Sequence, residues 1–202
     1  MTDILTAIAE RRSAKRFDPS VTIPGHELRA ILDAGRHAPT AFNIQHWRFV
    51  VVSDPALRKE IRAQAWNQPQ VEEASALIVL CADFKAWKKN PGRYWAEAPA
   101  KMRETYESMI HSFYEGREQL QRDEGIRSCG IAAYALMLAA AAHGYQSCPM
   151  DGFDFEAVGK LINLPPDHEV VMFVAIGKQT GEYPPHGGHL PLDETIIHNR
   201  FA

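Results

Sequence analysis

The sequence has few cysteines and no long apolar run. The only cysteines among its 202 residues are Cys81, Cys129 and Cys148. An odd number of cysteines without a CxxC pair gives no basis for a disulfide framework or a zinc site. The longest apolar stretch, residues 131–142, is too short and too rich in alanine to span a membrane. The first residues also lack the basic and apolar regions of a secretion signal. We therefore expect reduced thiols and a cytoplasmic protein.

Positive charge and glycine-rich nucleotide motifs are lacking as well. The net charge of -3 and a pI near 6.3 give no general attraction for nucleic acid or an anionic membrane surface, so neither partner is expected. There is no GxGxxG after a strand and no Walker lysine loop, which disfavours the Rossmann and P-loop modes of nucleotide binding. The hydrophobic share of 46% and the length favour one globular domain over residues 1–202.

Hydrophobic periodicity predicts an α+β fold in which helices flank a mixed sheet. Nearly continuous apolar runs predict buried strands at 47–52, 76–81 and 170–176. Helical spacing of apolar residues predicts a first helix that follows Thr2-Asp3 and ends at the basic residues, and a second around Leu28 that stops before Ala38. The same spacing predicts helices at 55–66, 101–124, 126–143 and 155–162. Residues 84–99 have no clean period, and we expect them to form an excursion over a site.

A cluster of cations follows the first predicted helix. Arg11, Arg12, Lys15 and Arg16 surround Ser13 within six positions. The planar guanidinium fork, the compact ammonium and the short hydroxyl together suit a phosphate group. From these residues alone, a solvated charged face or a helix C-terminus favoured by the helix dipole is an equal alternative.

Four further motifs follow in a fixed order. They are Ala38-Pro39-Thr40-Ala41-Phe42-Asn43-Ile44-Gln45-His46-Trp47, Ala65 to Val71, Gly144 to Asp154, and His189-Leu190-Pro191-Leu192. With the basic cluster, they resemble the FMN-dependent nitroreductase family, particularly the small bacterial flavoproteins that reduce quinones and nitro compounds. The resemblance extends from the first helix to Leu192. It implies a nitroreductase-like α+β fold, with a mixed and mostly antiparallel sheet, in an intertwined homodimer.

The resemblance assigns the basic cluster and two amides to FMN. Arg11, Arg12, Ser13 and Lys15 would hold the phosphate and one edge of the flavin, and Lys15 would stabilise the negative charge of the reduced ring. Asn67 and Gln70 would meet the pyrimidine edge, because an amide offers both a donor and an acceptor. A surface lysine and a helix-capping asparagine are the plain alternatives for Lys15 and Asn67.

Two loops complete the implied flavin site. Pro39, Thr40 and Asn43 would reach the flavin across the dimer interface, with Phe42 near the substrate; turn formation is the alternative for Thr40 and Asn43. The other loop has backbone N–H groups that would face flavin N5 and O4, and its members are Pro149, Met150, Asp151 and Gly152. Gly152 would permit close backbone approach, although a simple Pro-x-Asp-Gly turn has the same composition.

The C-terminal segment departs from the family pattern. Relatives place lysine or arginine before the Leu-Pro pair, whereas this chain has Gly187, Gly188 and His189. His189 would be a pH-dependent substitute at the phosphate. His186 and His189 have no third ligand nearby in the sequence, so we expect no metal.

The implied function is an FMN-dependent NAD(P)H oxidoreductase with ping-pong kinetics, NADH or NADPH as donor, and nitro-aromatics, quinones or similar small molecules as acceptors. No catalytic side chain is expected, because the flavin carries the chemistry. The alternatives are a specialised reductase of the same fold and a non-catalytic flavin- or ligand-binding protein. In the homodimer the apolar 126–143 helix would lie at the centre, and residues 178–202 would form an arm docked on the partner subunit.

Overall fold

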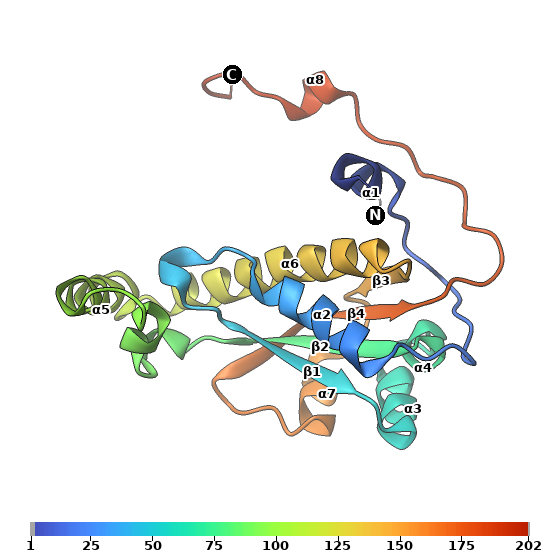
Figure 1. Cartoon of the computed structure of the whole chain (residues 1–202), viewed down its shortest axis with the longest axis horizontal. Helices are drawn as coiled ribbons and strands as arrows, with labels where there is room; N and C mark the ends of the chain where they lie inside the picture. The colour runs from blue at the N-terminus through green and yellow to red at the C-terminus, as the bar shows by residue number, and fades with distance from the viewer. Residues whose placement is uncertain (1–2, 202) are drawn as a thin grey trace.

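The computed structural model describes residues 3–201 (Figure 1). Its strands are β1 (Trp47–Val52), β2 (Ala76–Asp83), β3 (Gln146–Met150) and β4 (His168–Gly177). Its α-helices are α1 (Ile4–Glu10), α2 (Gly25–Arg36), α3 (Pro55–Gln64), α4 (Gln70–Glu73), α5 (Ala100–Tyr114), α6 (Glu118–Ala142), α7 (Phe155–Leu161) and α8 (Leu192–Thr195). Short 3-10 helices are η1 (Ala41–Asn43), η2 (Ala86–Lys88) and η3 (Pro91–Trp95).

The four strands form one sheet in the order β1-β2-β4-β3, and each neighbouring pair is antiparallel. The expected α+β fold with a mostly antiparallel sheet is therefore confirmed, and these four strands contain no parallel pair. Parallel pairing in the described part of the chain is confined to an isolated bridge between Ser13 and Ser147. The sequence analysis predicted no strand at β3 and placed only its last two residues, Pro149 and Met150, in a loop. The β3 backbone pairs with β4, a contact between distant segments that local hydrophobic periodicity does not encode.

Helices cover both faces of the sheet, as the alternation of patterns predicts (Figure 1). In β2, Leu77, Val79 and Cys81 point to the face covered by α3, α4 and α7. The intervening Ile78 and Leu80 point to the face covered by α2 and α6. All of these side chains are completely buried, which explains why β2 has a continuous apolar sequence.

Helix starts follow their local sequence. Asp54 caps α3 by accepting a hydrogen bond from Ala56 N at 2.9 Å, and Pro55 occupies its first turn. Asp154 caps α7 in the same way, from Ala157 N at 2.9 Å. The predicted boundary near residue 125 is wrong, because the break falls at residues 115–117, where Gly116 adopts a left-handed φ of 68°.

Helix α6 spans 25 residues and lies along the sheet beside α2 (Figure 1). By length and composition alone it could cross a membrane, and 44% of its most apolar window is buried in the structure. Its Cys129, Ala132 and Leu136 are completely buried in the core against the sheet. Ile131 and Tyr134 on this helix remain 41% and 38% exposed. Helix α1 likewise exposes Ile4, Leu5 and Ile8. These two helices therefore present apolar side chains that the single chain does not cover.

An ion-pair network joins the 84–99 excursion to the end of the sheet. Asp83, at the end of β2, is 1% exposed, and its carboxylate accepts from Arg48 at 2.9 Å and from Lys89 at 3.0 Å. Lys89 also lies 2.6 Å from Asp167, whose pKa is lowered to about 2 by that ammonium and by His168. Oxygen and nitrogen atoms of Asp83, Asp167 and His168 gather as metal ligands would, but two cations already neutralise these carboxylates.

His46 is buried between the start of β1 and α6. It is 1% exposed, and its Nδ1 lies 3.2 Å from Ser128 Oγ. Burial lowers its pKa to about 4; the Asp83 carboxylate acts in the opposite direction and the Arg48 guanidinium in the same direction. The imidazole is therefore neutral in the folded protein at neutral pH.

We expect His46 to make the protein sensitive to mild acid. Its folded pKa lies below the usual 6.5, so the unfolded chain binds the extra proton first and stability falls as pH drops from about 6.5 towards 4. The loss between about pH 7 and pH 5 is ~2 kcal/mol from this group. Urea unfolding at both pH values measures it. In His46→Gln the dependence is expected to flatten, whereas His26→Gln, at an exposed position, serves as the control; equal pH slopes in all three proteins would refute the assignment.

Candidate functional site

The basic cluster lies against the free edge of β3. Arg11 N caps α1 by donating to Ala7 O, and the chain then runs alongside β3. There, Ala14 N donates to Ser147 O at 3.0 Å, next to the bridge between Ser13 and Ser147. Ala14 is completely buried and fixes this segment, whereas Lys15 is exposed. The end of α1 and the edge of the sheet thus hold the cationic side chains in place.

Two polar atoms in this region are buried without a hydrogen-bond partner among the described residues. They are the donor Arg11 Nη1 and the acceptor Gln70 Oε1. Gln70 begins α4 and is 3% exposed. Burial raises the pKa of the Cys148 thiol, while Lys15, Gln70 and Arg11 act in the opposite direction, which places these three side chains around Cys148. Because an unpaired buried polar group is costly, the arrangement suits a ligand that accepts from Arg11 and donates to Gln70.

A cavity of about 260 Å³ opens beside the cluster. It is lined by Arg11, Arg12, Ser13, Lys15 and residues 184–187. Arg12 donates to Pro184 O, and its guanidinium lies 5.3 Å from the centre of the Tyr183 ring. His186 lines this cavity. The expected His189 does not line it; its side chain is exposed, and its ring centre lies 4.9 Å from that of His186.

The two expected segments at residues 67–70 and 149–152 lie side by side. Gln68 Nε2 donates to Gly152 O at 2.9 Å. A Cβ atom on Gly152 would approach Trp66 Cζ3 to 2.6 Å, so a side chain there would displace the indole. Asn67 is exposed with a left-handed φ of 56°, and it does not cap α3, whose C-cap is Ala65.

Pro149 and Met150 end β3 next to this contact. Pro149 is half-buried and Met150 is 5% exposed, while Asp151 is exposed. The structure therefore brings together the basic cluster, Gln70, the Asn67 turn and the 149–152 segment around one end of β3. These segments come from three separate parts of the sequence, at residues 11–16, 67–70 and 149–152.

The loop with Pro39, Thr40, Phe42 and Asn43 lies at the opposite end of the sheet. It precedes Trp47, which pairs with Ala82 at one end of β2, whereas Ser147 aligns through Ile176 with the other end. The five steps of β1 alone correspond to about 17 Å. Pro39 and Asn43 are exposed, and Thr40 Oγ1 accepts from Gln45 N at 3.1 Å. One chain therefore does not place this loop beside the basic cluster.

The sequence analysis missed several residues of these sites. Gln68, Tyr183 and His186 contact or line the cluster side. Trp95 contacts the Phe42 loop and belongs to the 84–99 excursion that was expected to lie over a site. Gln68 stands between two expected residues, which was an available signal. Tyr183 and His186 reach the basic cluster only through the fold of the 178–202 segment. The irregular composition of that segment gave no signal for these contacts.

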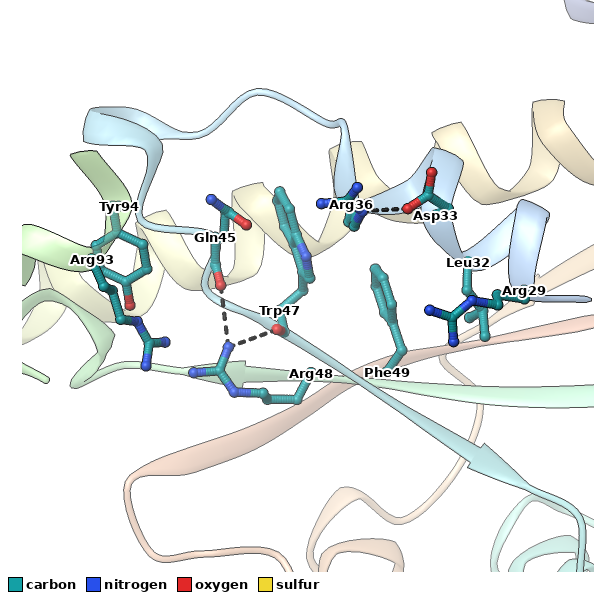
Figure 2. A pocket seen from close by; sticks show the side chains of 10 residues that line it. All are labelled: Arg29, Leu32, Asp33, Arg36, Gln45, Trp47, Arg48, Phe49, Arg93 and Tyr94. Atoms are coloured by element: carbon teal, nitrogen blue, oxygen red, sulfur yellow. Dashed lines mark hydrogen bonds and ion pairs between the residues drawn. The ribbon is translucent and has the colours of Figure 1, made fainter. Parts of the chain in front are cut away.

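A larger cavity of about 780 Å³ lies at the edge of β1 (Figure 2). Its aromatic wall is Trp47 and Phe49, whose rings are stacked with centres 6.3 Å apart. Guanidinium groups face it from α2, β1 and η3, namely those of Arg29, Arg36, Arg48 and Arg93 (Figure 2). In the described part of the chain, β1 pairs only with β2, so this edge carries free backbone donors and acceptors.

The cysteines are unreactive by their surroundings. All three are buried and unpaired by disulfides. Burial raises the pKa of the Cys81 and Cys129 thiols to about 12. Since the thiolate is the reactive form, neither thiol is a nucleophile at neutral pH.

Comparison with known proteins agrees with the motifs. The sequence profile of the nitroreductase family matches residues 8–178. Protein DrgA of Synechocystis is 49% identical over 182 residues, covering 90% of this chain and 87% of DrgA. An NADH dehydrogenase of Thermus thermophilus is 35% identical over 206 residues, covering 96% and 95% of the two chains.

A solved structure agrees over nearly the whole chain. It is a provisionally named nitroreductase from Exiguobacterium sibiricum in complex with FMN, with a TM-score of 0.89, 29% identity and coverage of 98% of both chains. The antiparallel four-stranded sheet with helices on both faces is thus the nitroreductase fold. The extent of these matches shows that this chain belongs to the nitroreductase family.

Proposed function

We propose that the protein is an FMN-dependent NAD(P)H oxidoreductase that reduces nitro-aromatics, quinones or similar electron-poor compounds. The observation that carries the proposal is the pair of orphaned buried atoms, Arg11 Nη1 and Gln70 Oε1, in one cationic site. A phosphate accepts from the first, and the N–H of a flavin pyrimidine edge donates to the second. The FMN-bound relative and the NADH dehydrogenase relative support the same cofactor and donor.

In this proposal the basic cluster binds the FMN phosphate and the amide side chains orient the flavin ring. Arg11, Arg12 and Ser13 hold the phosphate, and Lys15 lies at the flavin edge where negative charge develops on reduction. Asn67 and Gln70 hold the pyrimidine edge, and the backbone of residues 149–152 lies along the ring. FMN, when bound, supplies the transfer of electrons from a nicotinamide to an acceptor in two half-reactions. No protein side chain acts as nucleophile or general acid.

A homodimer completes the site in this proposal. The Phe42 loop lies at the far end of the sheet from the basic cluster, so a second copy supplies it. The exposed apolar residues of α1 and α6 would meet across the interface. The arm from residue 178 extends away from the sheet and ends above the body (Figure 1); it exposes Leu190, Leu192, Ile196, Ile197 and Phe201.

The cavity at the β1 edge is a suitable receiver for the partner's arm. Its aromatic wall matches the apolar arm residues. Arg29 and Arg93, which have no ion pair among the described residues, complement Asp193 and Glu194 of α8. Free backbone groups of β1 would pair with an extended segment. The dimer is proposed to act in the cytoplasm as a single-domain enzyme, with 178–202 as the exchanged arm.

The proposal is tested by purifying the protein and recording its flavin absorption, then adding FMN if colour is absent. NADH and NADPH are next offered with a nitro-aromatic and a quinone at varied concentrations. Ping-pong kinetics gives parallel lines in double-reciprocal plots. A colourless protein that FMN does not reconstitute would refute the assignment, and activity confined to another acceptor class would indicate a specialised reductase.

His189→Arg tests whether the arm reaches the phosphate. His186 lines the cavity and His189 lies against His186, so a permanent guanidinium at position 189 is expected to lower the FMN dissociation constant. His198→Arg, on the same arm, is the control for added charge. Fluorescence titration of the apoprotein measures the dissociation constants, and equal values for His189→Arg and His198→Arg would remove His189 from the phosphate.

A further inference from the structure

The turn that carries Phe42 is held in a backbone conformation that its residues disfavour. Phe42, Asn43 and Gln45 have φ values of 53°, 58° and 54°, all in the left-handed region. Asparagine tolerates this region, whereas a bulky phenylalanine does not. Such residues persist only where the surrounding structure fixes them. The contacts that fix this turn are therefore informative.

Two hydrogen bonds join the turn to the 84–99 excursion. Trp95 Nε1 donates to Phe42 O at 3.1 Å, and Asn43 Nδ2 donates to Tyr94 O at 2.9 Å. The bonds run in opposite directions, one from the excursion to the turn and one back. Between the left-handed residues, Ile44 is completely buried and anchors the turn from below.

Helix α5 in turn fixes the indole of Trp95. The Trp95 ring stacks on Tyr106 of α5 with centres 3.8 Å apart and planes 3° apart. The same helix contacts the Phe42 ring, with centre distances of 5.4 Å to Phe113 and 6.2 Å to Tyr114. The direction of the Phe42 ring thus depends on a left-handed backbone that Trp95 and α5 hold together.

We propose that Trp95 is a positioning residue that sets acceptor specificity by locking Phe42 in its left-handed conformation. This rests on the proposed function, in which Phe42 faces the acceptor. With the lock intact, the half-buried ring offers a fixed wall to a flat, electron-poor aromatic acceptor. Without the indole N–H the strain of Phe42 favours other conformations, and the wall is no longer preformed, which weakens acceptor binding.

The excursion offers a matched control. Trp87 lies in η2 and is 6% exposed, and its Nε1 has no hydrogen-bond partner in the described part of the chain. Trp95→Phe keeps an aromatic ring for Tyr106 but deletes the N–H bond to Phe42. Trp87→Phe removes an indole from the same excursion without deleting such a bond. Only the first substitution should release the turn.

Hydrogen exchange followed by mass spectrometry tests the lock directly in the full-length protein as purified. Loss of one hydrogen bond should raise the exchange rate of peptides covering residues 39–46 by about two- to tenfold in Trp95→Phe. Peptides from β2 should be unchanged, and Trp87→Phe should resemble wild type over residues 39–46. Unchanged exchange in Trp95→Phe, or an equal rise in both variants, would overturn the lock.

Steady-state kinetics tests the consequence for the acceptor. In Trp95→Phe the KM for menadione should rise about two- to tenfold, while the rate with ferricyanide, an outer-sphere acceptor that needs no aromatic wall, stays within about twofold. An unchanged menadione KM beside faster exchange would overturn the specificity role. If wild type reduces neither acceptor with NADH or NADPH, the proposed function fails, whereas the exchange experiment still decides whether Trp95 locks the turn.

Discussion

Replacing Arg11 by alanine is expected to raise the FMN dissociation constant by about ten- to hundredfold. A charge-assisted hydrogen bond contributes ~1.5–3 kcal/mol, which corresponds to that range. Arg11 is favoured over the other cations because its Nη1 is buried with no protein partner in the described residues, so its donor is free for a phosphate. Arg12, by contrast, already donates to the Pro184 carbonyl. Titration of apoprotein with FMN, followed by quenching of flavin fluorescence, measures the effect.

The control for this prediction is Lys59→Ala. Lys59 is an exposed cation on α3, away from the basic cluster, and its removal changes the net charge by the same amount. Its FMN dissociation constant should match wild type. Thermal unfolding of both apoproteins separates lost binding from lost folding. Equal affinity of Arg11→Ala and wild type would show that the buried guanidinium does not reach the phosphate.

The fold could be predicted where local sequence decides it. The strand at 47–52 and the starts of α3 and α7 depend on apolar runs, Asp54 and Asp154, and these predictions are confirmed. The break before α6 was misplaced because the change from polar to apolar residues near residue 125 hid the effect of Gly116. Strand β3 was missed because its pairing with β4 joins residues that lie 23 to 31 positions apart, so no local period indicates it.

The site was predictable in composition but not in arrangement. Sequence motifs indicated the cations and the amides, whereas the bridge from Ser13 to Ser147 that brings them together depends on the folded sheet. The same holds for the arm, where His186 rather than His189 lines the cavity. Strain in the Phe42 turn was also hidden, because the backbone angle depends on the distant Trp95 indole.

Removing residues 182–202 is expected to convert the proposed dimer into a monomer and to release FMN. The cut keeps two contacts of the arm with its own body, since Thr180 N still donates to Arg16 O and Gln179 N still donates to Gln146 Oε1. It removes the contacts of Tyr183 and Pro184 with Arg12. It also removes five exposed apolar side chains. Full burial of one such side chain contributes ~1.5–3 kcal/mol of favourable free energy. In the dimer these side chains would be partly buried on the partner subunit. Truncation removes that burial, so the dimer dissociation constant is expected to rise by at least about a hundredfold.

Full-length variants separate arm docking from any folding defect of the shortened chain. Ile197→Asp puts one charge on the apolar end of the arm, and Asn199→Asp puts the same charge two positions away, where the native side chain is already polar and exposed. If Ile197 packs against the aromatic wall of the β1-edge cavity, only the first variant should weaken the dimer, because a carboxylate buried against Trp47 and Phe49 is costly. Sedimentation velocity at micromolar protein, monitored at both protein and flavin wavelengths, reports dimer and FMN together. A truncated chain or an Ile197→Asp variant that stays a flavin-loaded dimer would show that the arm is dispensable for assembly, and the Phe42 loop would then need another route to the basic cluster.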